Sequence, residues 1–415
     1  MHYLGKSIHV LLLIITLLLI APVVWAAPQT EWSATEESPL GMMKAEEPSP
    51  SMMEEPTLRI MEKLDFKQVE KTVEQMNQEL GNYMPTVDWQ QLLQDIRRGE
   101  VHWSLQSVLS GIGRYLFQEV LANTTLLAQL VILAVICAVL QNLQGAFNEG
   151  TVGKLAHAVC YLVLLTIALS SFVMAVQIGR EATARMVTFI QALVPLLLTM
   201  MVAVGGFTSA AMLSPYITAS LGIFSFLINY IVFPLIFLSA VLSIVNQLSD
   251  RFQVSRLAGL LRQASIWCLG LVMTLFIGVL SIQGAMGAVA DGITLRAAKF
   301  ATGTFVPIVG GSFADAIDAV IGYALLLKNS IGILGLVVMF GLCIFPVLKI
   351  LAITLAYKIA AVLVQPLGDE GTAEALQSLS GSLGLIMVTV ACIGLMFFMT
   401  ITIILGVSSL TTMLR

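Results

Sequence analysis

The stretch Gly303–Gly322, with the sequence GTFVPIVGGSFADAIDAVIG, lies in a long apolar region but lacks the composition of an ordinary membrane-spanning helix. Pro307 and the pair Gly310-Gly311 interrupt a helix, and Asp315 and Asp318 are costly in hydrocarbon. Interrupted backbone at membrane depth is tolerated only where protein or water covers it. We therefore predict a membrane bundle organised around a re-entrant or cavity-lining element.

The composition of the whole chain is that of an integral membrane protein. Of its 415 residues 58% are hydrophobic and 11% charged, and the mean hydropathy is +0.91, which soluble globular domains do not reach. Residues 27–123 carry sixteen acidic against eight basic side chains, a net charge of -8, whereas residues 124–415 carry nine against twelve, a net of +3. This division predicts an acidic region outside the membrane followed by a membrane domain.

The N-terminal part divides into three segments. Residues 1–26 resemble a secretory signal peptide, with Lys6, an apolar core and a small-x-small site ending at Ala26; an uncleaved membrane anchor is the alternative. Residues 27–57 are acidic and rich in proline, as in a flexible linker. Residues 58–120 are predicted to form a small extracytoplasmic helical region. Its first apolar stripe could pack within the chain or pair with a partner helix.

From residue 121 to 415 the sequence predicts an all-α, polytopic membrane domain of about seven spans plus a re-entrant or amphipathic element. The spans are placed near 121–143, 155–177, 186–204, 216–244, 265–290, 330–348 and 383–407. Pro234 predicts a tilt or kink in the fourth span. Residues 349–365 either extend the sixth span or lie along an interface, and residues 246–262 read as an amphipathic element.

The sequence contains none of the common catalytic motifs. It has no nucleophile elbow, zinc-protease motif, phosphate-binding loop or dinucleotide fingerprint, and only His157 among four histidines falls in the membrane domain. The five cysteines all lie in apolar segments without C-x-x-C spacing, so we expect them to pack as small hydrophobic side chains. We predict no enzyme activity, no metal or other cofactor, and no nucleic-acid partner.

The candidate pore or gating residues are Pro307, Gly310, Gly311, Asp315, Asp318 and Lys328. Asp315 and Asp318 are three residues apart and thus share one helical face. They could bind a cation, relay protons or line a pore; alternatively, they lie on a water-facing surface near a helix start, where the helix dipole favours acids. Lys328 could pair with either carboxylate.

A series of short segments gives the C-terminal part a resemblance to a known family. They are Phe305-Val306-Pro307 with Gly310, Phe313, Asp315-Ala316 and Asp318, then Leu327-Lys328-Asn329, Phe345-Pro346 with Lys349, Tyr357-Lys358-Ile359-Ala360, Gln365-Pro366-Leu367-Gly368, Leu395-Met396-Phe397-Phe398 and Met413-Leu414-Arg415. In this order and spacing, over about residues 295–415, the chain resembles stage III sporulation protein AE of endospore-forming bacteria.

The resemblance implies a non-enzymatic role in sporulation. Proteins of this family belong to the stage III sporulation A complex in the mother-cell membrane around the forespore, which with stage II sporulation protein Q is thought to form a channel or feeding apparatus. That apparatus supports late forespore gene expression and forespore integrity. The expected function is therefore that of a multi-pass membrane component of this channel complex. A self-sufficient secondary transporter and a non-conducting scaffold of the complex are the alternatives.

Overall fold

The computed structural model describes residues 70–72, 74, 105–146, 151–248, 254–305, 310–367 and 370–413. The regular structure in these ranges is entirely helical, as the all-α prediction required. The predicted signal peptide, the linker and most of the extracytoplasmic helical region 58–120 lie outside the described residues, so those predictions stand untested.

Helices α5 (Leu105–Ala122) and α6 (Thr124–Ala146) form the first described pair. They meet at Asn123, whose Nδ2 donates to the Glu119 carbonyl at 2.8 Å. The Thr124 hydroxyl donates to the Leu121 carbonyl at 2.6 Å. The Glu119 carbonyl also accepts the backbone N–H of Asn123 at 3.1 Å, so side-chain and backbone donors together satisfy the carbonyl groups at the end of α5.

Helix α7 (Thr151–Ala203) corrects the predicted span pattern, because the spans predicted at 155–177 and 186–204 form one unbroken helix. The charged segment between them contains neither proline nor asparagine. In it Arg185 and Glu181 lie 3.9 Å apart across one helical turn, a spacing that supports helix. At 1.5 Å per residue the 53 residues of α7 extend for about 80 Å, well beyond the ~30 Å hydrocarbon layer of a bilayer.

The next run is nearly continuous helix from α8 (Phe207–Leu227) through the π-helical turn η1 (Ile228–Val232) to α9 (Phe233–Leu248). The π turn directly precedes Pro234, and the Phe233 N–H bonds to the Ile228 carbonyl five residues back. Proline lacks the N–H that an α-helix would use there, and a single π turn is a common adjustment inside a helix. A π-helical turn therefore lies beside Pro234, where the sequence predicts a tilt or kink.

Helices α10 (Ser255–Phe305), α11 (Gly310–Val364) and α12 (Glu370–Met413) complete the bundle, with the 3₁₀ turn η2 (Gln365–Leu367) between the last two. Residues 349–365 therefore extend the sixth predicted span. The predicted re-entrant element is absent as a separate unit in the described part of 303–322. There α10 ends at Phe305 and α11 begins at Gly310, so the interruption lies between two long helices.

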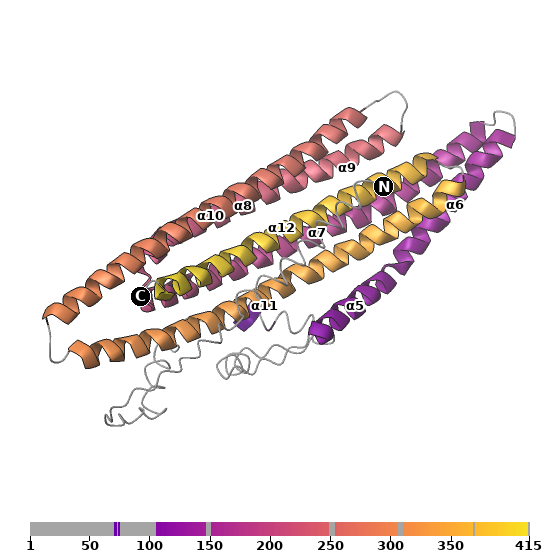
Figure 1. Cartoon of the computed structure of the whole chain (residues 1–415). Helices are drawn as coiled ribbons and strands as arrows, with labels where there is room; N and C mark the ends of the chain where they lie inside the picture. Colours follow the sequence, from indigo (N-terminus) through magenta and orange to yellow (C-terminus); the bar gives the residue numbers. More distant parts are fainter. Residues whose placement is uncertain are drawn as a thin grey trace, which may run out of the picture.

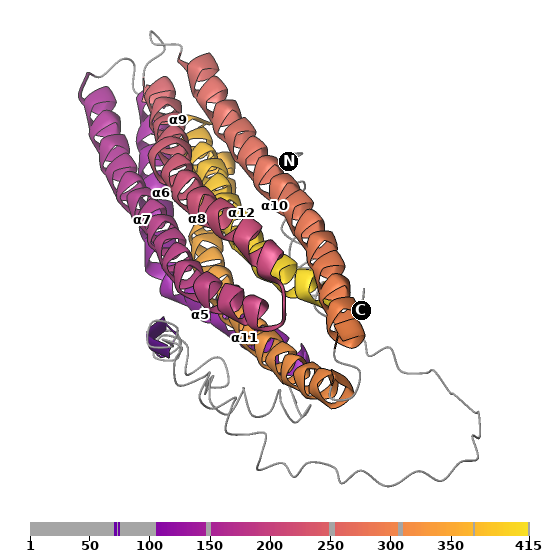
Figure 2. The same ribbon diagram turned by 90° about the vertical axis from the view of Figure 1, so that its left-hand side faces the viewer.

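The long helices lie side by side in an elongated bundle, with α6 and α10 on opposite sides (Figures 1 and 2). Helix α12 packs against α11, α7, α9 and α10. Among the described residues six helical runs are long and apolar enough to cross a membrane; those of α11 and α12 are 72% and 78% buried, against 22% for α6 and 28% for α10. Helices α11 and α12 are therefore the core.

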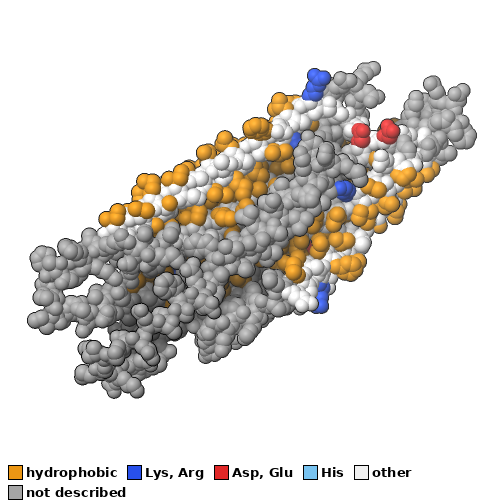
Figure 3. Space-filling view, viewed as in Figure 1, with side chains coloured by type: hydrophobic (Ala, Val, Ile, Leu, Met, Phe, Trp, Pro, Cys, Tyr) orange, Lys and Arg blue, Asp and Glu red, His pale blue; other side chains and the backbone are white. Residues whose placement is uncertain are grey.

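The outer surface of the described helices is mainly apolar. Figure 3 shows one face of it, on which hydrophobic side chains cover the helices and charged groups are few. Because contiguous apolar surface of this extent is unfavourable in water, the bundle is a membrane protein.

Candidate functional site

Four of the six predicted pore residues lie in the first turns of α11, and Lys328 lies further along the same helix. Pro307 falls in residues 306–309, outside the described part of the chain. Gly310 and Gly311 are the first residues of α11, and Asp315 and Asp318 follow within its first turns. The side chains of residues 301–320 are not among those described, so the direction of both carboxylates remains a prediction.

Lys328 is fully buried between α11 and α12. Its Nζ donates a hydrogen bond of 2.7 Å to the carbonyl of Ile404 on α12. In one helix the ten residues from Asp318 to Lys328 correspond to a rise of about 15 Å, which is too far for an ion pair within α11. The ammonium group instead connects the two core helices.

The core helices approach closely beside this lysine. A Cβ on Gly332, one turn along α11, would overlap with Cδ2 of Leu405. Small residues allow such backbone approach in membrane bundles. A change of charge at Lys328 or of side-chain size at Gly332 would therefore disturb the packing of α11 against α12 at this end.

Asp291 is a polar residue that the sequence interpretation did not single out. It lies on α10, 1% exposed, and accepts hydrogen bonds from the backbone N–H groups of Thr208 at 2.7 Å and Ser209 at 3.0 Å. Those groups are unpaired donors in the first turn of α8, so a carboxylate from a different helix fills the capping role. The preceding Gly205 has a φ of 93°, a conformation that glycine adopts readily.

Tyr357 makes a second polar connection in the core. Its hydroxyl bonds to the carbonyl of Ala168 and to the hydroxyl of Ser171, both on α7. The ring is fully buried on α11. Burial of a tyrosine is favourable when its hydroxyl finds a partner, and this contact sets the register of α7 against α11.

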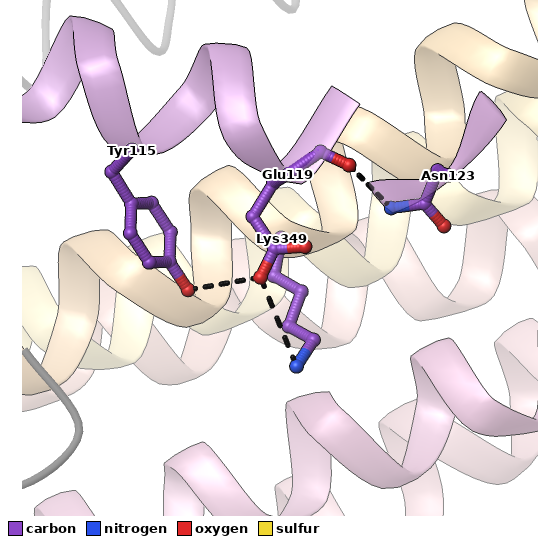
Figure 4. Close-up of polar contacts among 4 residues, drawn as sticks. All are labelled: Tyr115, Glu119, Asn123 and Lys349. Atoms are coloured by element: carbon purple, nitrogen blue, oxygen red, sulfur yellow. Dashed lines mark hydrogen bonds and ion pairs between the residues drawn. The ribbon is translucent and has the colours of Figure 1, made fainter. Parts of the chain in front are cut away.

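Glu119 connects α5 to the core (Figure 4). Its Oε1 accepts a hydrogen bond of 3.1 Å from the Tyr115 hydroxyl and lies 3.8 Å from Nζ of Lys349 on α11. The Glu119 side chain is only 16% exposed, and a partly buried carboxylate needs such partners. This cluster orients α5 against α11.

The described polar contacts hold helices in position. Within the described ranges, no three His, Cys, Asp or Glu side chains are placed to hold a metal ion. All five cysteines are free and at least partly buried, as their apolar surroundings in the sequence predicted.

Sequence comparison identifies relatives of the chain over most of its length. The family model described as stage III sporulation protein AE matches residues 87–408. The protein named stage III sporulation protein AE from Bacillus subtilis (strain 168) is 43% identical over 337 residues, which cover 81% of this chain and 84% of the relative. No solved structure matches the chain. The chain therefore belongs to the stage III sporulation protein AE family.

Proposed function

We propose that this chain is a membrane component of a channel complex between the mother cell and the forespore, required for sporulation. In this role it supports late forespore gene expression and forespore integrity and catalyses no reaction. The observation that carries the proposal is the family match over residues 87–408, supported by the 43% identical relative. The apolar helical bundle with six candidate spans suits a multi-pass component of such a complex.

The proposed location is the mother-cell membrane around the forespore. The proposed partners are the other stage III sporulation A proteins, stage II sporulation protein Q through the complex, and membrane lipid. By this proposal residues 1–26 act as a signal peptide and residues 58–120 form a helical region in the space between the two membranes.

Within this function, residues 303–322 are proposed to line or gate the passage, with Asp315 and Asp318 facing water. Both acids lie in an otherwise apolar segment of α11, and carboxylates at membrane depth are favourable only beside water or a polar partner. The test is the double variant Asp315→Ala, Asp318→Ala as the sole copy in the sporulating host. We expect normal complex assembly with a reduced yield of heat-resistant spores, and normal yield would refute the proposed gate.

Deletion of the gene from its host tests the proposed function itself. We expect engulfed forespores that fail to express a late reporter, and re-expression of the full chain should restore heat-resistant spores. Sporulation that proceeds normally without the gene would overturn the proposal. Uptake of solute by the purified chain alone in liposomes would favour the self-sufficient transporter. Assembly of partners with full tolerance of both Asp→Ala changes would favour the scaffold.

A further inference from the structure

The exposed face of α7 changes from apolar to polar part of the way along the helix. Its exposed side chains before residue 177 include large apolar ones such as Leu155 (67% exposed), Leu162 (51%) and Met174 (56%). From residue 177 to 199 the exposed positions are Gln177, Arg180, Glu181, Ala184, Arg185, Thr188, Gln191, Pro195 and Thr199. None of these nine is a large hydrophobic residue.

These positions form one continuous stripe. They recur at spacings of three and four residues, which places them on one side of an α-helix. The opposite side of the same segment is buried and apolar, with Phe189, Leu193 and Leu197 in the core. From Gln177 to Thr199 the stripe rises about 33 Å, close to the thickness of a bilayer's hydrocarbon core.

Neighbouring helices at the same level are apolar on their outer sides. Arg180 contacts the Asn229 carbonyl, and a Cβ built on Gly206 would lie against the Met201 side chain. This part of α7 therefore runs alongside α8 and η1. There α8 exposes Ile223 and Phe226, each 57% exposed.

The outer side of α10 is apolar at this level too. Tyr216 on α8 bonds to the Phe276 carbonyl of α10 at 3.2 Å, which sets the two helices side by side. Near that contact α10 exposes Leu275 (54%) and Ile282 (61%). Contact with lipid is therefore favourable for the outer sides of α8 and α10 and unfavourable for the polar stripe on α7.

Lipid contact with the stripe would be costly for its side chains. Exposed Arg and Glu in hydrocarbon are expensive and point to a protein or water-filled environment. Gln191 lies well inside the stripe, and among the described residues nothing bonds to its amide; an amide in hydrocarbon without a hydrogen-bond partner is unfavourable. Water provides the donors and acceptors that this face lacks.

We infer that the exposed face of α7 between Gln177 and Thr199 is the wall of a water-filled passage that carries small hydrophilic solutes across the membrane. This inference rests on the proposed function and assigns the conducting surface within it. The wall lies on the outside of this bundle, so another chain of the assembly closes the passage.

The test is thiol accessibility in the full-length chain, expressed as the sole copy in sporulating cells with its five cysteines replaced. Thr188→Cys, Gln191→Cys and Thr199→Cys are treated with a negatively charged, membrane-impermeant methanethiosulfonate. The matched controls are Thr218→Cys on α8 and Thr274→Cys on α10. Both are exposed threonines whose hydroxyl bonds to the carbonyl four residues back, as in Thr188 and Thr199.

We expect modification at the three α7 positions and protection at the two control positions. Protection of all three α7 positions, with full reaction after denaturation, would overturn the inference because it would show a dry surface. Equal modification on α7 and the controls would also overturn it, since the apolar helices would then be wet. If a variant fails to accumulate, Ala184→Cys tests the same face with a smaller change.

The outcomes separate this inference from the proposed function. Hydrated α7 positions in cells whose sporulation does not depend on the gene would refute the sporulation role alone. Protected α7 positions in cells that require the gene would refute the passage alone.

Discussion

The contact between α8 and α10 gives the most direct prediction of a change in stability. Gly287 on α10 lies against the start of α8, and a Cβ built there would be 2.6 Å from Oγ and 2.8 Å from Cα of Ser209. The hydroxyl could rotate away, but the Cα belongs to the backbone. Because carbon atoms normally approach to 3.5–4.0 Å, Gly287→Ala requires the two helices to separate by about 1 Å.

That separation would also weaken the cap on α8. Asp291, one turn further along α10, holds two backbone N–H groups of α8 at 2.7 and 3.0 Å, and a shift of this size takes both beyond hydrogen-bond length. Overpacking of a tight contact costs about 1–3 kcal/mol. We therefore expect Gly287→Ala to destabilise the folded bundle by about 2 kcal/mol.

The assay is thermal unfolding of the purified chain in detergent micelles, followed by intrinsic fluorescence. Gly278→Ala is the matched control, because this residue of α10 has open space where the methyl group would lie. We expect a lower apparent melting temperature for Gly287→Ala and little change for Gly278→Ala. Equal melting temperatures in the two variants would refute the close approach of α10 to α8.

Substitutions at three further residues test the buried polar contacts by the same unfolding assay. Asp291→Ala should cost about 1 kcal/mol or more through loss of the α8 cap, and Asp291→Asn, which keeps an acceptor, should cost less; equal losses would exclude a hydrogen-bonding role. Lys328→Glu should cost roughly 3–5 kcal/mol, because a buried carboxylate would face the Ile404 carbonyl, whereas Lys328→Met should be tolerated. Tyr357→Phe should cost about 1 kcal/mol or less. If the Ser171 hydroxyl is the main partner of Tyr357, Tyr357→Phe should cost nothing further in a Ser171→Ala variant, in which the Ala168 carbonyl is unchanged.

The sequence was sufficient to predict the helical membrane class and most helix positions. Long uncharged runs of apolar residues have few other structural solutions, and the irregularity near Pro234 follows from its missing N–H. The predicted division of α7 into two spans is wrong, because the segment with Arg180, Glu181 and Arg185 continues the helix. Charge alone does not end a helix, and this segment lacks a strong helix breaker.

The polar contacts were only partly predictable. Lys328 was predicted to pair with Asp315 or Asp318, but its Nζ bonds to a backbone carbonyl on α12, which sequence patterns do not encode. Asp291 was missed although it is an acid next to a long apolar run, the same signal that drew attention to Asp315 and Asp318. Its role as a cap depends on the packing of α10 against α8, which only the three-dimensional arrangement reveals.

By our proposal, this bundle provides a hydrated route that is needed for sporulation. The most direct measurement is the count of heat-resistant spores formed with Thr188→Val, Gln191→Leu, Thr199→Val as the sole copy, with the amount of chain in the membrane measured in parallel. We expect normal amounts of protein and spore counts as low as after gene deletion, whereas the double variant Thr218→Val, Thr274→Val should sporulate normally. Normal spore counts from the triple variant would contradict it.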